Sequence, residues 1–199
     1  VDRIHNQNNY KHRILYYGPS SSKDLLATID QYHQVPATLK DIPAGNEYSY
    51  LETPATKVLV APYEAKQIYM AQVSNLDKKY DPAIEPTREL YNEYFGGGMN
   101  SIVFQEMRET RGLAYSAWAG IMPPSYLKYP YTIRTQIATQ NDKMIDAVNT
   151  FNDIINNMPE SDAAFKLAKE GLINRMRTDR IIKSDIIWTY INAQDLGQS

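Results

Sequence analysis

The sequence of 199 residues contains no cysteine. This absence excludes a disulfide framework, a thiolate zinc site, an iron–sulfur cluster and a cysteine nucleophile, and it leaves the redox compartment open. The apolar runs are only a few residues long, whereas a membrane-spanning helix needs about 20 residues, so we expect no membrane contact in this segment. The 21 lysine and arginine residues and the 23 aspartate and glutamate residues form no basic stripe, which argues against nucleic acid as a partner.

Histidine is scarce as well. His5, His12 and His33 are the three histidines, and no two of them are four residues apart, which is the spacing that places two ligands on one helical face. We therefore expect no metal site in this chain and interpret all three as surface or strand-edge residues. The sequence also lacks the G-x-S-x-G motif, so a serine hydrolase is disfavoured.

The hydrophobic pattern predicts an α+β fold. The predicted strands cover residues 13–17, 57–61, 67–73, 114–121 and 131–139, and 57–61 should pair with 67–73 as an antiparallel hairpin. The predicted helices cover residues 23–33, a segment from Pro82 or Pro86 to 95, and residues 101–111, 141–158, 161–176 and 184 onward. This order favours a two-layer sandwich, in which helices cover one face of a mostly antiparallel sheet.

The clearest helical signal lies in the last third of the chain. Apolar residues recur there at intervals of three and four, which predicts one buried helix face, made of Met144, Ile145, Val148, Phe151, Ile155 and Met158.

Three consecutive glycines, Gly96, Gly97 and Gly98, separate two of the predicted helices. A phosphate-binding loop is disfavoured because the triplet follows a helix and is not followed by Gly-Lys-Ser/Thr. We favour a joint between helices that needs positive φ angles. The alternative is a loop kept free of side chains so that another backbone can pass close by.

Arg108 and Tyr115 are predicted to lie at the same corner, since the chain turns at Gly112 between a helix and a strand. A guanidinium group offers a fixed fork of N–H donors and a phenol offers one O–H donor, and together they suit a peptide carbonyl or an oxyanion. Chemistry alone favours a structural role instead, in which Arg108 pairs with a surface carboxylate and Tyr115 packs in the sheet.

Residues 95–116, FGGGMNSIVFQEMRETRGLAYS, resemble the C-terminal-domain signature of the pitrilysin (insulinase, mitochondrial-processing-peptidase) family of zinc metallopeptidases. The resemblance implies a metallohydrolase-like α+β domain over 1–199, a single domain of the C-terminal type. It also implies a piece of a longer chain. Its partner would be a homologous domain with the zinc motif His-x-x-Glu-His, in the same polypeptide or in another subunit. This chain lacks that motif.

The family resemblance also implies roles for individual residues. Arg108 and Tyr115 match the arginine and tyrosine, seven residues apart, that hold the substrate carbonyl opposite the zinc. Gly96, Gly97, Gly98 and Phe104 would contact the peptide substrate.

No cofactor is expected in this chain, and zinc is expected in the partner domain. Two functions stay open: the non-zinc half of a peptidase, or a structural scaffold of the same family. The presence of both Arg108 and Tyr115 favours the first.

Overall fold

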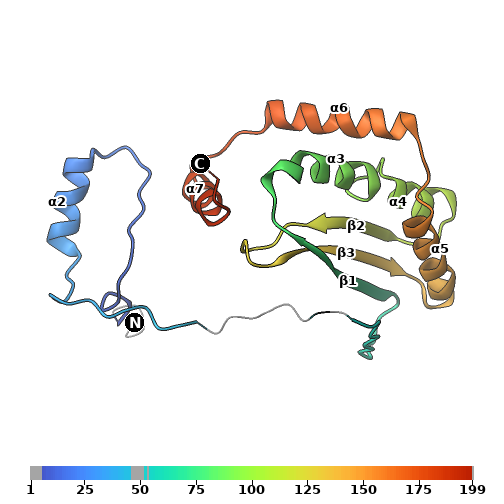
Figure 1. Cartoon of the computed structure of the whole chain (residues 1–199), viewed down its shortest axis with the longest axis horizontal. Helices are drawn as coiled ribbons and strands as arrows, with labels where there is room; N and C mark the ends of the chain where they lie inside the picture. Colours follow the sequence, from blue (N-terminus) through green and yellow to red (C-terminus); the bar gives the residue numbers. More distant parts are fainter. Residues whose placement is uncertain (1–5, 46–51, 53, 199) are drawn as a thin grey trace. The chain divides into compact units, whose positions relative to one another are not determined.

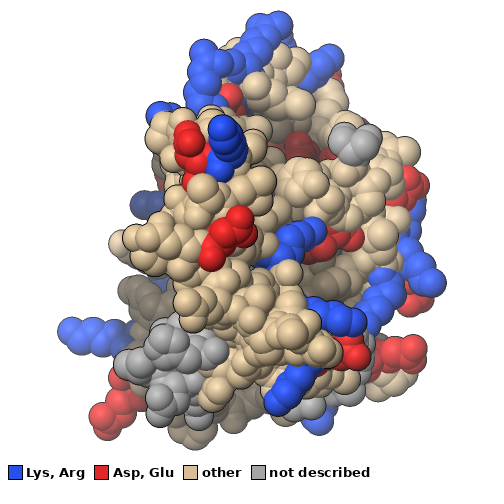
Figure 2. Space-filling view, turned by 90° about the vertical axis from the view of Figure 1, so that its left-hand side faces the viewer, with Lys and Arg blue, Asp and Glu red and all other residues tan. Residues whose placement is uncertain are grey.

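The computed structural model describes residues 6–45, 52 and 54–198. These residues divide into two compact units, one within 1–49 and 181–199 and the other within 50–180. In the part of the chain that is described, no helix has the length and apolarity needed to cross a membrane. On the face shown in Figure 2, positive and negative side chains are interspersed, in keeping with the even charge balance of the sequence.

The first unit contains two helices, α2 (Ser22–Tyr32) and α7 (Ile186–Asp195). Helix α2 begins at the N-cap Ser21, whose side chain accepts a hydrogen bond from the backbone N–H of Asp24. The predicted helices at both places are confirmed. Neither helix has a buried residue, so the first unit has little apolar core of its own.

The second unit is an open antiparallel sheet with helices on one face (Figure 1). Its strands are β1 (Ile68–Lys79), β2 (Ser116–Met122) and β3 (Pro130–Thr139), arranged in the order β1-β3-β2. Its helical elements are η1 (Pro82–Ile84), α3 (Glu85–Phe95), α4 (Ile102–Phe104), η2 (Gln105–Thr110), η3 (Asn141–Lys143), α5 (Met144–Asn156) and α6 (Asp162–Thr178). The predicted α+β fold is confirmed.

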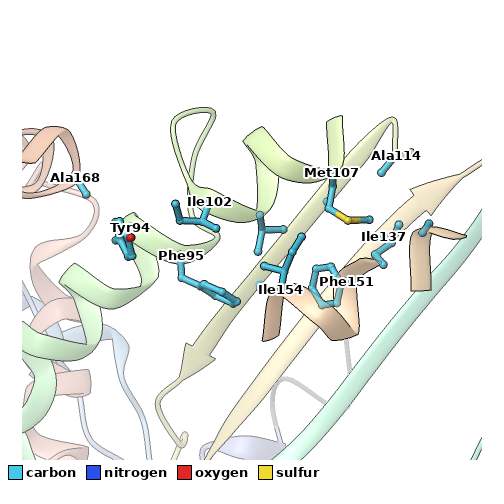
Figure 3. Packing of buried hydrophobic residues seen from close by; sticks show 13 residues of the cluster. Tyr94, Phe95, Ile102, Met107, Ala114, Ile137, Phe151, Ile154 and Ala168 are labelled. Atoms are coloured by element: carbon cyan, nitrogen blue, oxygen red, sulfur yellow. The ribbon is translucent and has the colours of Figure 1, made fainter. Parts of the chain in front are cut away.

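The core of the second unit lies between the sheet and its helices. The register pairs Met70 with Ile137 and Ile137 with Ala117, so these three side chains share the face toward α3, α4 and α5. Phe151 and Met107 fill the space above that face and are fully buried (Figure 3). Ala117 and Ala119 are the small, buried residues of β2 on this face, so α3 and α4 lie close to this strand.

The buried face of α5 differs from the predicted one. Phe151 is buried as expected, but Ala147 and Ile154 are its buried companions, while Ile145 is 75% exposed. The predicted helix is confirmed, but its buried face is rotated toward Ala147 and Ile154, and Ile155 of the predicted face is exposed as well. Tertiary packing selects the face that fits, and the apolar pattern alone does not encode that choice.

Two of the predicted strands do not form. Residues 13–17 form no regular secondary structure and are mostly exposed, and in residues 57–61 the side chains of Val58, Leu59 and Val60 are 79–85% exposed. Strand β1 pairs with β3 rather than with 57–61, so the predicted hairpin is wrong. A strand needs hydrogen bonds from a neighbour, and within the described ranges neither segment lies in a sheet.

Candidate functional site

The candidate site lies where the helix layer meets the start of β2. Ser101 caps α4 by accepting a hydrogen bond from the backbone N–H of Phe104, and the chain then continues as the π-helical turn η2. Short π-helical turns occur frequently at functional sites, because the extra residue per turn shifts the direction of the side chains that follow. Arg108 lies within this turn.

Gly112 reverses the chain after η2. Its φ of +57° is a left-handed conformation that favours glycine, and its N–H donates to the carbonyl of Arg108. The N–H groups of Leu113 and Ala114 both donate to the carbonyl of Met107, which closes the end of the helix. The N–H of Tyr115 then donates to Ala138 of β3 over 2.8 Å. The turn therefore fixes the backbones of both Arg108 and Tyr115.

The side chains of these residues meet in a stack. The guanidinium carbon of Arg108 lies 5.1 Å from the ring centre of Phe104 and 5.9 Å from that of Tyr115. Both distances suit attraction between a cation and the face of an aromatic ring. Three residues expected from the sequence are thus brought together at one corner.

The corner is open to solvent. Tyr115 is 70% exposed and the side chain of Arg108 is 47% exposed. The nearest ion-pair contact of Arg108 is Glu109 Oε1 at 3.7 Å from Nε, which is long for a hydrogen bond and leaves the guanidinium donors accessible. Tyr115 does not pack into the sheet, so the structural interpretation of this residue is wrong.

The glycine triplet has a different role from the one favoured by the sequence. None of the three glycines has a positive φ; Gly96 has a φ of −147°. A Cβ on Gly96 would lie 2.3 Å from the carbonyl oxygen of Ala119, and one on Gly97 would lie 2.7 Å from that of Asn92. The expectation of positive φ is corrected, and the alternative of a close backbone approach holds for Gly96, which lies against β2.

The glycine loop is tied to the helix that carries Arg108. The side-chain amide of Gln105 donates to the carbonyl of Met99 over 2.6 Å, and the hydroxyl of Ser101 donates to the carbonyl of Gly98 over 2.6 Å. Gly98 also borders a hollow of about 110 Å³ between the loop and α6, whose walls include Glu93 and Ala168. The hollow shows that one side of the loop meets open space.

Asn92 fixes α3 to the outer edge of β2, a contact that sequence analysis missed. Its carboxamide accepts from the backbone N–H of Ile121 over 2.8 Å and donates to the carbonyl of the same residue over 2.9 Å. The side chain of Arg88 donates to that carbonyl as well. No local pattern marks Asn92, since its partner Ile121 lies 29 residues further along the chain.

A polar network secures the other end of α3. Tyr131 of β3 donates to Glu85 over 2.6 Å, and Arg88 makes a 2.7 Å ion pair with the same carboxylate. Burial raises the pKa of Glu85, but the hydrogen bonds from Arg88 and Tyr131 outweigh it and leave the pKa lowered overall. Burial, then the hydrogen bond to Glu85, raises the pKa of Tyr131 to about 12. This network is structural and lies on the scaffold, not in the candidate site.

Metal ligands do not converge in the described ranges, where no group of three or more histidine, aspartate or glutamate side chains could hold an ion. His12 and His33 share one hydrogen bond, with 2.7 Å between their Nε2 atoms. His5 lies outside the described residues.

Comparison with known families decides the classification. The family model described as "Peptidase M16 inactive domain" matches residues 13–172, more than half of the chain. The chain belongs to this family. The M16 inactive domain is the non-zinc, C-terminal-type domain of pitrilysin-family peptidases, so the resemblance of residues 95–116 is confirmed at the level of the family.

Two solved structures have the same fold as this M16 inactive domain. One is a peptidase M16 inactive domain from Pseudomonas fluorescens, with 18% identity and a TM-score of 0.52 over 69% of this chain. The other is a protease from Helicobacter pylori, with 12% identity and a TM-score of 0.59 over 89% of this chain. This chain spans 32% and 44% of their respective lengths. No curated protein matches the sequence.

Proposed function

We propose that this M16 inactive domain is the non-zinc half of a pitrilysin-type metallopeptidase. It binds extended peptide and completes the active site of a zinc-bearing homologous domain, in the same polypeptide or in a partner subunit, and it has no activity alone. The observation that carries the proposal is the solvent-exposed stack of Phe104, Arg108 and Tyr115. A scaffold has no need for two accessible donors at one corner.

The residues of the corner divide the work between them. The zinc of the partner domain would supply an activated water molecule for hydrolysis. The hydroxyl of Tyr115 and the guanidinium of Arg108 donate to the carbonyl oxygen of the substrate and stabilise the negative charge that develops on it. The ring of Phe104 contacts the guanidinium of Arg108 and restricts its rotamers before substrate binds, so less side-chain entropy is lost on binding. The glycine loop, which the Gln105 side chain ties to the helix that carries Arg108, would contact the bound peptide as well.

The test uses this chain together with the zinc-bearing half of its parent enzyme. Tyr115→Phe should lower kcat/KM for peptide cleavage by roughly 100-fold, about 3 kcal/mol, since one oxyanion donor is lost. Tyr63→Phe, which removes the same hydroxyl from an 85% exposed residue, is the matched control and should change nothing. Cleavage that is unaffected by Tyr115→Phe would exclude the proposed role.

A second variant separates function from stability. Arg108→Ala should raise KM and lower kcat, while the melting temperature of the chain stays nearly unchanged, because the side chain is half exposed and lacks a close ion pair. A large fall in melting temperature would instead identify Arg108 as a structural residue.

A further inference from the structure

The sheet of the second unit has a second face, opposite the helices, which we call the open face. Side chains alternate across a strand, so the neighbours of Met70, Ile137 and Ala117 point away from the core. Thr132 and Ala138 of this face are buried, whereas the following side chains are exposed or half-exposed: Tyr69, Val73, Trp118, Met122, Arg134 and Gln136. Tyr69 is 63% exposed and Val73 is 51% exposed, so large apolar groups remain accessible there.

Arg134 lies in the middle of the open face. It belongs to the central strand β3 and is paired in register with Val73 of β1 and Gly120 of β2. Its Nε donates a hydrogen bond to the hydroxyl of Thr132 over 3.3 Å, and it has no carboxylate partner among the described residues. Its terminal guanidinium nitrogens are thus available to a ligand.

The charge of the sheet favours an anionic ligand. The three strands contain one acidic residue, Asp77, against three cations, Arg134, Lys78 and Lys79. Asp77 is near the far end of β1, beyond the irregularity in the register that follows Asn75. The positive charge at the centre of the face is therefore not compensated by the sheet itself.

An apolar surface adjoins this charge. A Cβ on Gly120 would meet Met122 Cε at 3.1 Å and Trp118 Cζ2 at 3.3 Å, so these two side chains close over the glycine. Gly120 is the register neighbour of Arg134. Arg134 is thus paired in register with a glycine that an indole and a thioether border, so a carboxylate bound by Arg134 would have apolar groups of the same face nearby.

We propose that the open face binds an extended peptide that carries an aspartate or glutamate, whose carboxylate pairs with Arg134 while neighbouring apolar side chains lie over Trp118 and Met122. This inference rests on the proposed function, since it names an acidic class of peptide as the substrate. It goes beyond the Arg108 and Tyr115 corner, because Arg134 selects the peptide and does not act on the bond that is cleaved.

The test measures binding by fluorescence anisotropy with the whole chain and no partner domain. The probe is a dye-labelled peptide of about ten residues, which spans about 33 Å when extended, with both ends blocked, alternating leucine and serine, and one central glutamate. A second peptide has glutamine at that position. The glutamate peptide should bind roughly fivefold more tightly at low ionic strength, as expected for an exposed ion pair, and the difference should shrink with salt.

Variants assign the effect to the open face. Arg134→Gln should abolish the preference for glutamate and leave the affinity for the glutamine peptide unchanged. Arg177→Gln removes the same charge from an exposed position on α6 and should keep the preference. Trp118→Ser should weaken both peptides alike, provided that its melting curve remains cooperative.

Three results would overturn the inference: equal affinity for the two peptides, an equal loss in Arg134→Gln and Arg177→Gln, or tighter binding of a single-stranded oligonucleotide than of the glutamate peptide. These results are independent of the cleavage assay. If Tyr115→Phe leaves cleavage unchanged, the proposed function is wrong and the peptide preference still stands. If the chain shows no preference for the glutamate peptide, the inference about the open face is wrong and the proposed function still stands.

Discussion

Replacing Gly96 by alanine tests the close approach between the end of α3 and strand β2. The added Cβ would lie 2.3 Å from the carbonyl oxygen and 2.7 Å from the nitrogen of Ala119, and both atoms belong to the backbone. Ordinary contacts begin at 3.4 Å, so helix and strand must separate by about 1 Å. A rearrangement of this size in a packed core costs about 3 kcal/mol, and it also strains the contacts of Asn92 with Ile121.

The free energy of unfolding can be measured by urea denaturation followed by tryptophan fluorescence. A Trp188→Phe background leaves Trp118, which lies in the sheet, as the single reporter. Gly96→Ala should lower the urea midpoint and leave the slope of the transition nearly unchanged.

Gly98→Ala provides the matched control. Its nearest neighbour is a carboxylate oxygen of Glu93 at 3.8 Å, and its φ is not positive. Alanine there should be neutral or stabilise the chain by about 0.5 kcal/mol, because it reduces the entropy of the unfolded state. Equal losses in Gly96→Ala and Gly98→Ala would refute this reasoning, since they would show that the loop needs glycine for its backbone freedom and not for space.

Two further predictions concern buried polar groups in β3. The hydroxyl of Thr135 is buried with no hydrogen-bond partner among the described residues, so Thr135→Val should raise the free energy of unfolding by about 1 kcal/mol. Thr139→Val should lower it by a similar amount, because the hydroxyl of Thr139 donates to the carbonyl of Leu113 over 2.5 Å. Changes of the same sign for the two variants in urea titrations would contradict this pair of expectations. The pKa of Tyr131 rises from 10.0 unfolded to about 12 folded, so its contribution of up to about 2.7 kcal/mol is complete below pH 10 and is lost as the pH rises toward 12. Tyr131→Phe should therefore lose less stability than the parent chain between these two pH values, and parallel losses would exclude this group as the cause.

Local signals predicted most elements of the second unit. Ser101 and Ser161 are predicted to begin helices, and each accepts a hydrogen bond from the backbone N–H of the residue three positions later. The strands near 67–73, 114–121 and 131–139 also formed. The segments 13–17 and 57–61 have equally good strand composition, but strand formation depends on a partner distant in sequence, which composition does not reveal.

The geometry of the candidate site was predictable in part. The seven-residue spacing and the turn at Gly112 placed Arg108 and Tyr115 at one corner, as the structure shows. The four-residue spacing of Phe104 and Arg108 places both side chains on one side of a helix, and it could have indicated their contact, which the sequence analysis did not predict. Their roles in catalysis remain predictions for the cleavage assay.

The contact of Asn92 with Ile121 has a consequence for how the sheet can grow. The carboxamide of Asn92 occupies the backbone N–H and carbonyl of Ile121, which an added strand would need for pairing, so α3 blocks strand addition at this point of β2. A strand that joined the sheet at Ile121 would have to displace the carboxamide of Asn92, so β2 can gain a neighbour there only if α3 moves away.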